Sequence, residues 1–265
     1  MVGPASATAN GIALFDGTTG KLLKDSAATN GLIYGLTIGR GAGGVATNTA
    51  IGYASLFSNT TGYQNTAVGH TSLNANTTGV RNAAFGDVSL PVNTTGSDNV
   101  SVGSNAMYAS TTGSSNTAIG SQSLQANTTA GNNTAVGTQS MYQNTTGASN
   151  TGIGIYALFG NTTGSNNVAL GQSALQSNTT ASNNVAIGHQ ALITSTTAAN
   201  NVAVGYQAGN LNTTGDLNVF IGNEAGLSNT TSASNTAVGS AALRSNTTSV
   251  SNSAFGSAFR ALALP

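Results

Sequence analysis

The sequence predicts an all-β protein, a parallel β-solenoid (β-roll) whose coils are 17 residues long. Three observations indicate this fold class. The motif Asn-x-Ala-(Val/Ile)-Gly, with few substitutions, recurs every 17 residues from Asn48 onward. The residues within the motif alternate as in a β-strand, and each repeat contains one turn sequence, Asn-Thr-Thr-Gly or a close variant. A short repeat of constant length is typical of a chain that stacks one coil on the next, so we expect a rod.

The two constant residues of the motif have different expected roles. Stacked coils place identical residues ~4.8 Å apart, so the asparagines should form a structural ladder of side-chain amides, hydrogen-bonded from coil to coil. The glycine can turn the chain at positive φ or let another backbone come close. The asparagine ladder comprises Asn48, Asn65, Asn82, Asn99, Asn116, Asn133, Asn150, Asn167, Asn184, Asn201, Asn218, Asn235 and Asn252. The structural turn glycines are Gly52, Gly69, Gly86, Gly103, Gly120, Gly137, Gly154, Gly171, Gly188, Gly205, Gly222, Gly239 and Gly256.

The strand within each motif has one β-branched face and one small face. In the coil that begins at Asn65, Thr66 and Val68 share one face and Ala67 points the other way. We expect the Val/Ile face to be covered by a second short strand five residues on, which turns a larger apolar residue inward against it. That second apolar position is occupied by Leu73, Leu90, Met107, Leu124, Met141, Leu158, Leu175, Leu192 and Leu243.

The turn sequence closes each coil. Asn-Thr-Thr-Gly is a turn by composition, and the glycine is replaced in some coils by alanine or serine, as at Ala130 and Ser232. This replacement indicates that the position does not always require positive φ. The Asn-Thr-Thr triplets are also formal glycosylation acceptors, although no secretory signal accompanies them.

The chain divides into two parts. Residues 1–47 differ from the repeats and are predicted to form an N-terminal cap or attachment segment, whereas residues 48–265 form the solenoid shaft. Within the first part, residues 36–39 (Leu-Thr-Ile-Gly) resemble the strand motif, and we interpret them as a shortened first coil. Solenoids need modified ends because an open terminal coil presents unpaired strand edges.

Composition excludes several classes of partner. Six basic and six acidic residues balance, which argues against a nucleic-acid partner or an anionic membrane surface. There is no cysteine for disulfides or thiolate metal sites, and no apolar stretch approaches the ~20 residues of a membrane span. The abundance of Gly, Ser, Thr and Asn could instead indicate disorder, but disordered tracts do not keep a constant repeat length.

The sparse core indicates more than one chain. Each coil offers only a few large apolar side chains to offset the entropy of ordering 17 residues. The alanine face of the strand would permit close approach, so several chains could pack these faces around a shared axis. We expect a homotrimer.

Two family resemblances follow from these motifs. The Asn-Val-Ala-Ile-Gly strand at residues 184–188 resembles the Ser-Val-Ala-Ile-Gly element of YadA-like trimeric adhesin heads, which implies a left-handed parallel β-roll with three chains. Residues 3–8 (Gly-Pro-Ala-Ser-Ala-Thr) and 12–26 (Ile-Ala-Leu-Phe-Asp-Gly-Thr-Thr-Gly-Lys-Leu-Leu-Lys-Asp-Ser) resemble a segment of bacteriophage tail fibre proteins that precedes similar repetitive shafts. This second resemblance covers essentially the whole chain. It implies a trimeric tail fibre shaft, located in the virion or on an extracellular surface, that attaches to a host glycan or protein.

No catalytic or metal-binding constellation is evident, and we expect neither an enzyme nor a cofactor. His70 and His189 occupy the same variable position after the motif glycine, which favours exposed variants of a tolerant site. The acidic residues lie on separate coils rather than in a pair.

The coils near residues 206–227 depart from the pattern. Gly209 and Gly226 replace the leucine, Phe220 replaces the motif alanine, and Tyr206 and Glu224 add unusual outward groups. One interpretation is local repacking. The other is a ligand patch formed by Tyr206, Phe220 and Glu224.

The favoured function is a structural fibre or adhesin subunit. The alternatives are a self-assembling extracellular filament, a bacterial surface adhesin and an ice-binding solenoid. Ice binding needs two outward threonine columns spaced i and i+2 on one strand, whereas the threonines of the turn are adjacent.

Overall fold

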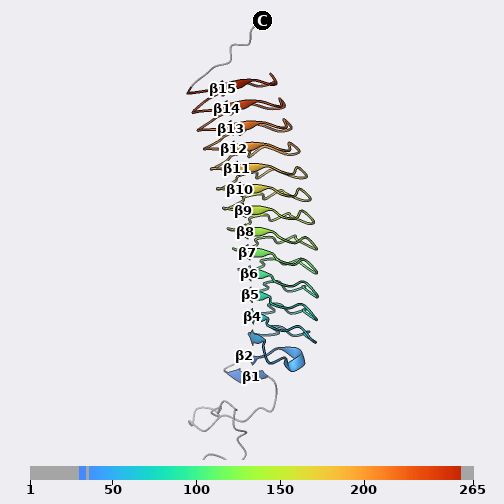
Figure 1. The fold of residues 1–265 in the computed structure, drawn as a ribbon. Coiled ribbons are helices and arrows are strands. Elements are labelled where there is room, and N and C mark those ends of the chain that lie inside the picture. The colour runs from blue at the N-terminus through green and yellow to red at the C-terminus, as the bar shows by residue number, and fades with distance from the viewer. Residues whose placement is uncertain (1–29, 34–35, 258–265) are drawn as a thin grey trace, which may run out of the picture.

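The computed structural model describes residues 30–33 and 36–257. They form one 15-stranded sheet whose strands follow one another in sequence order along a rod (Figure 1). A short 3-10 helix, Ala42–Gly44, precedes the first regular coil. The strands are β1 (Asn30–Ile33), β2 (Leu36–Gly39), β3 (Thr49–Ile51), β4 (Thr66–Val68), β5 (Ala83–Phe85), β6 (Val100–Val102), β7 (Thr117–Ile119), β8 (Thr134–Val136), β9 (Thr151–Ile153), β10 (Val168–Leu170), β11 (Val185–Ile187), β12 (Val202–Val204), β13 (Val219–Ile221), β14 (Thr236–Val238) and β15 (Ser253–Phe255).

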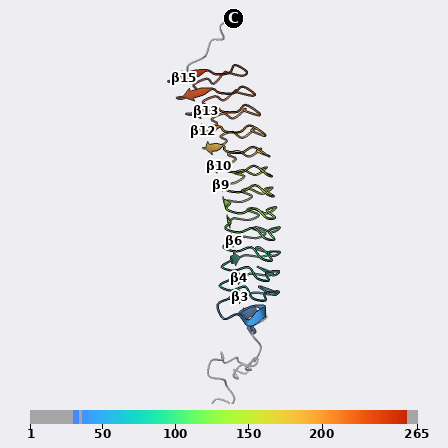
Figure 2. The ribbon, with the colours of Figure 1, turned by 45° about the vertical axis from the view of Figure 1, so that its right-hand side comes forward.

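From β3 to β15 the coils stack in register. Every strand pairs in parallel with the next, and each residue faces its equivalent 17 positions later, as Ala50 faces Ala67. Figure 2 shows the stack turned by 45°, with coil above coil along the whole shaft. The predicted parallel β-solenoid of 17-residue coils is therefore confirmed.

Each described coil contains a single three-residue strand, so the expected second strand at the leucine position is wrong. Leu73 has φ 50° and Thr71 has φ 51°, which is left-handed rather than extended backbone. The N–H groups of this segment nevertheless reach other coils. Leu73 N–H donates to Ser89 O at 3.0 Å, and Thr71 N–H donates to Tyr53 O at 2.8 Å. Because left-handed residues alternate along this segment, their N–H groups point in turn toward the preceding coil and toward the following coil. The segment is therefore hydrogen-bonded to both neighbouring coils, as a strand would be.

The two faces of the strand are reversed relative to the expectation. The middle residue of each strand points into the coil, and Ala67 and Leu73 are both fully buried. The β-branched residues on either side of it point outward and are half-buried or exposed. The core is thus a column of alanine opposite a column of leucine or methionine. A coil of 17 residues is narrow, and a large side chain from one side leaves room for only a methyl group from the other.

The first strands differ from the shaft. β1 pairs antiparallel with β2, and β2 pairs antiparallel with β3, so that Ile38 faces Ile51. The interpretation of residues 36–39 as a shortened first coil is therefore wrong, because a solenoid coil would run parallel to β3. Segments 3–8 and 12–26, which carry the tail fibre resemblance, lie outside the described residues.

The motif glycines form a column with backbone that side chains rarely adopt. Their φ values lie between 115° and 139°. A Cβ atom on Gly137 would lie 2.7 Å from the carbonyl of Gly154 in the next coil. Glycine is required here both for the dihedral angle and for the close approach of successive coils. The glycine of the Asn-Thr-Thr-Gly turn is different, since Gly79 lies outside the left-handed region.

Candidate functional site

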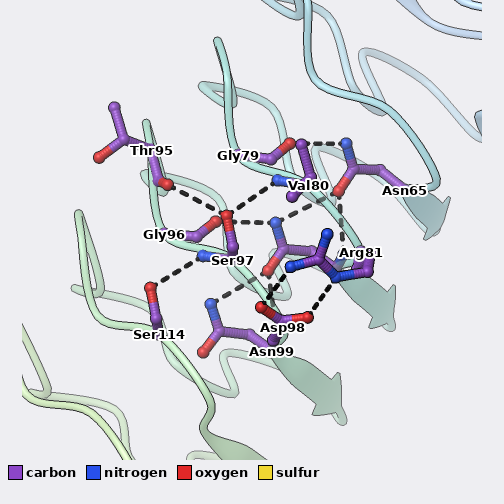
Figure 3. A network of polar contacts seen from close by, with 11 residues as sticks. Asn65, Gly79, Val80, Arg81, Thr95, Gly96, Ser97, Asp98, Asn99 and Ser114 are labelled. Atoms are coloured by element: carbon purple, nitrogen blue, oxygen red, sulfur yellow. Dashed lines mark hydrogen bonds and ion pairs between the residues drawn. The ribbon is translucent and has the colours of Figure 1, made fainter.

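The motif asparagines form a buried column on the axis side of the strands. Asn82 is typical: its backbone N–H donates to Asn65 Oδ1 at 2.9 Å, and its Nδ2 donates to Gly96 O at 2.8 Å. Figure 3 shows the equivalent hydrogen bond one coil earlier, from Asn65 Nδ2 to Gly79 O at 2.8 Å. Direct amide-to-amide contacts are present only in some coils, as from Asn99 Nδ2 to Asn82 Oδ1 at 3.0 Å. The regular link is therefore from backbone N–H to side-chain oxygen. The side chain joins two coils through its oxygen and closes its own coil through its nitrogen.

A second asparagine column, at the first residue of the Asn-Thr-Thr turn, is the true amide ladder. Asn76 Nδ2 donates to Asn59 Oδ1 at 2.9 Å and to Gly79 O at 3.0 Å. The sequence contains a signal for this column, because the position accepts only asparagine or serine, although the same residues also predict a turn. We call it the turn-asparagine column. It comprises Asn59, Asn76, Asn93, Asn127, Asn144, Asn161, Asn178, Asn212, Asn229 and Asn246, with Ser110 and Ser195 in two coils.

Burial of the turn-asparagine column bears on the glycosylation triplets. The amide nitrogens of these triplets are already hydrogen-bonded within the rod, and Asn76 and Asn93 have no exposed surface. A glycan on such a nitrogen would have to replace both hydrogen bonds and the packing around them. In the folded coil these acceptors are therefore closed to modification.

The two threonines of the turn play different roles. Thr77 Oγ1 donates to Thr94 O at 3.0 Å, which is the equivalent residue of the next coil. Thr78 and its equivalents are exposed. Only one of the adjacent threonine columns thus offers its hydroxyl groups to solvent.

The outward face of the strands is an uninterrupted apolar strip. We define the outer strip as the last residue of each strand from β3 to β15. Its larger members are partly exposed, with Ile119 at 41 % and Ile153 at 42 %. The strip consists of Ile51, Val68, Phe85, Val102, Ile119, Val136, Ile153, Leu170, Ile187, Val204, Ile221, Val238 and Phe255. The strip runs from the first regular coil to the last and contains no charged residue.

Several of the charged groups form pairs between adjacent coils at the surface. His70 Nδ1 lies 3.0 Å from Asp87 Oδ1, and the ring of His70 stacks on Tyr53 with centroids 5.7 Å apart. Arg81 Nη2 donates to Asp98 Oδ2 at 2.8 Å (Figure 3). This hydrogen bond and the charge of the guanidinium lower the pKa of the Asp98 carboxyl below its usual value. These pairs tie neighbouring coils together at the surface, where solvent weakens each of them.

The structure does not bring the expected ligand patch together. Phe220 is fully buried, because it occupies the inward position of β13. Tyr206 is exposed and stacks on His189 with centroids 5.6 Å apart, and Glu224 pairs with Arg244. Phe220 therefore cannot contribute to a surface site, and that part of the patch is wrong.

Local repacking accounts for the irregular coils. A Cβ atom on Gly209 would lie 2.6 Å from Phe220 Cδ2, and one on Gly226 would also collide with this ring. The phenyl group thus fills the space that the leucines of two coils would otherwise occupy. The three substitutions form one compensated unit within the core.

Within residues 30–33 and 36–257, no group of three or more His, Cys, Asp or Glu side chains is placed to hold a metal ion. The same part of the chain contains no helix with the length and apolar character that crossing a membrane requires. Comparison with known proteins finds no matching family model, no matching curated protein and no matching solved structure.

Proposed function

We propose that the chain is the structural shaft of a fibre, and that three copies associate through the outer strip. The observation that supports this most directly is the strip itself. A continuous apolar column along a rod is typical of a surface that is covered by a partner. An in-register repeat gives every coil the same surface, so a partner copy can pair with it along the whole length.

This arrangement replaces the expected packing of alanine faces. The alanines are buried within their own chain, so they are not available to another copy. The valines and isoleucines supply the apolar area that was expected of the alanine face, and burying them supplies a driving force of ~25 cal/mol per Å². The proposed oligomer is therefore still a homotrimer, but with the opposite face of each strand at its centre.

The fibre belongs, in this proposal, to a phage tail, where it carries the virion to a host glycan or protein. The resemblance of the N-terminal segment and of the repeats to tail fibre shafts supports this assignment. A stiff rod suits this role because it transmits position along its length without chemistry, and the proposed role is not enzymatic.

The oligomeric mass tests the interface. Wild-type protein at micromolar concentration should sediment as three chains. The triple variant Ile119→Lys, Ile153→Lys, Ile187→Lys places charges on the outer strip and should sediment as one chain. The matched control Thr112→Lys, Thr146→Lys, Thr180→Lys adds the same charges on the exposed turn threonines and should remain trimeric. A monomeric wild type, or a trimeric strip variant, would contradict the proposal.

Electron microscopy tests the assignment to a tail. Negative-stain images should show discrete rods of one length, whereas continuous fibres would favour the self-assembling filament. Gold-labelled antibody against the rod should decorate the tails of virions of the phage that encodes the chain. Labelling confined to a cell surface would favour a bacterial adhesin instead.

A further inference from the structure

We propose that the shaft contains two built-in sites for a single buried water molecule, one beside Ser110 and one beside Ser195. Both serines lie in the turn-asparagine column, five coils apart, and each interrupts the ladder of amides. Each interruption leaves buried hydrogen-bonding groups without partners.

An intact rung shows what is lost. Asn93 Nδ2 donates to Asn76 Oδ1 at 2.9 Å and to Gly96 O at 3.0 Å, so both of its N–H groups have acceptors. Serine at the next position has no amide to continue this pattern. As a result Asn93 Oδ1 has no donor, and the Ser110 hydroxyl has no partner, although both atoms are buried.

The coil above Ser110 is also affected. Asn127 Nδ2 makes one hydrogen bond, to Ala130 O at 3.1 Å, where its equivalents in intact rungs make two. One N–H of Asn127 therefore points toward the position of the missing amide oxygen. The interruption leaves an acceptor below, a donor above and a hydroxyl beside them.

The second interruption repeats the first. Asn178 Oδ1 and Ser195 Oγ are buried without partners. Asn212 Nδ2 in the coil above makes one hydrogen bond, to Gly215 O at 2.9 Å. The same three groups are thus left in the same arrangement at two independent places.

Water is the ligand that this arrangement fits. Serine is shorter than asparagine by two heavy atoms, and the groups around the freed space are one acceptor, one donor and a hydroxyl that can do either. A buried water typically makes about three hydrogen bonds to such groups. Asn93 and Asn127 lie two coils, about 10 Å, apart, so the water and the Ser110 hydroxyl bridge them together. The water would donate to Asn93 Oδ1 and accept from the Ser110 hydroxyl, whose Oγ can then accept from Asn127 Nδ2. The column contains only asparagine and serine, so a neutral ligand is favoured over an ion.

Magnetic relaxation dispersion of oxygen-17 water tests the proposal, because it counts water molecules held inside a protein for longer than its tumbling time. The variant Ser110→Asn, Ser195→Asn restores the ladder and should lose a dispersion amplitude that corresponds to two waters per chain. It should also unfold at a higher denaturant concentration. The control Ser121→Asn, Ser240→Asn changes two exposed serines and should leave the amplitude unchanged.

An equal amplitude in the wild type and a folded Ser110→Asn, Ser195→Asn variant would overturn the proposal. If that variant does not fold, a crystal structure of the wild-type protein decides. Density for an ordered water within hydrogen-bond distance of both Asn93 Oδ1 and Ser110 Oγ supports the proposal. Direct contact between these two atoms, or an empty site, overturns it.

Discussion

At the scale of single residues, the side chain of each motif asparagine is constrained by two hydrogen-bonding partners in fixed directions. Asn99 Oδ1 accepts from the backbone N–H of Asn116 at 3.0 Å, and Asn99 Nδ2 donates to Gly113 O at 2.8 Å. Aspartate has the acceptor but no donor, and serine is too short to reach both coils. The geometry explains why one residue type recurs at this position.

Replacement of Asn99 by alanine should be strongly destabilising. The change leaves the buried N–H of Asn116 and the C=O of Gly113 without partners, at a cost of about 2–4 kcal/mol in the free energy of unfolding. Chemical denaturation at equal protein concentration measures it. Asn223→Ala, an exposed asparagine after the motif glycine, is the control and should change stability by less than about 0.5 kcal/mol. Equal effects of the two changes would contradict the role of the ladder.

Left-handed residues other than glycine are a second feature at this scale. They recur in every regular coil, at the second residue after the motif glycine, at the leucine and before the motif asparagine. Val88 has φ 53°, which is unfavourable for a β-branched side chain, while Asn105 adopts φ 55° at the same position one coil later. Some coils therefore hold residues that their backbone disfavours.

Val88→Asn should stabilise the shaft. Asparagine tolerates left-handed backbone better than valine, so we expect a gain of about 0.5–1 kcal/mol despite the loss of apolar surface. Thermal or denaturant unfolding measures the gain. Val92→Asn is a matched control, because Val92 is exposed and does not have positive φ. A decrease in stability for Val88→Asn would show that packing of the valine outweighs backbone strain.

At the scale of the element, two kinds of residue column stabilise each coil, one by apolar packing and the other by hydrogen bonds between coils. Alanine and leucine fill the interior, and backbone and asparagine amides link each coil to the next. Because only one strand of three residues is present, the turns must contribute hydrogen bonds between coils, as Thr77 N–H does to Thr94 O at 2.9 Å. A coil therefore has no independent stability and depends on its neighbours.

The compensated unit around Phe220 gives a sharp prediction for packing. Phe220→Ala should cost about 3–5 kcal/mol, because a cavity forms beside two glycines. The triple variant Gly209→Leu, Phe220→Ala, Gly226→Leu restores the regular coil and should recover most of this loss. Leucine has φ 50° at Leu192, so the backbone accepts it.

Denaturant unfolding of the single and triple variants tests this coupling. Gly226→Leu alone serves as the control, since it adds a side chain against the intact phenyl ring and should destabilise. Independent, additive effects of the three substitutions would show that they do not share one space.

At the scale of the whole molecule, register is the property on which the shaft depends. Each side chain meets its own equivalent above and below, so a change in coil length would set unlike residues against one another. The same property gives the outer strip its continuity, and with it the proposed association of three chains.

Deletion of one whole coil should be tolerated. Removal of residues 133–149 joins Asn132 to Asn150 and preserves the period, so the protein should fold into a rod shorter by ~4.8 Å. Small-angle scattering measures the length, and circular dichroism reports folding. Removal of residues 133–148, one fewer, shifts the register and should lower the unfolding midpoint markedly. Similar stability of the two deletions would mean that the coils are not locked in register.

The period of 17, the parallel stack, the asparagine column and the glycine column could all be predicted from the amino-acid sequence. Each of these features depends on a residue that recurs at constant spacing, and a short repeat of constant length indicates equal coils stacked in register. Local repacking of the coils near Phe220 could also be predicted, because two leucines are lost where one phenylalanine is gained.

Which face of the strand lies inside the coil could not be predicted without the folded structure. Alternation between Thr66, Ala67 and Val68 defines two faces but does not say which one the coil closes around, and the width left beside Leu73 makes it the alanine. The left-handed backbone at Leu73 and the antiparallel β2 were hidden for a related reason. Both depend on hydrogen bonds to neighbouring coils, and a composition rule applied to one short segment does not include those partners.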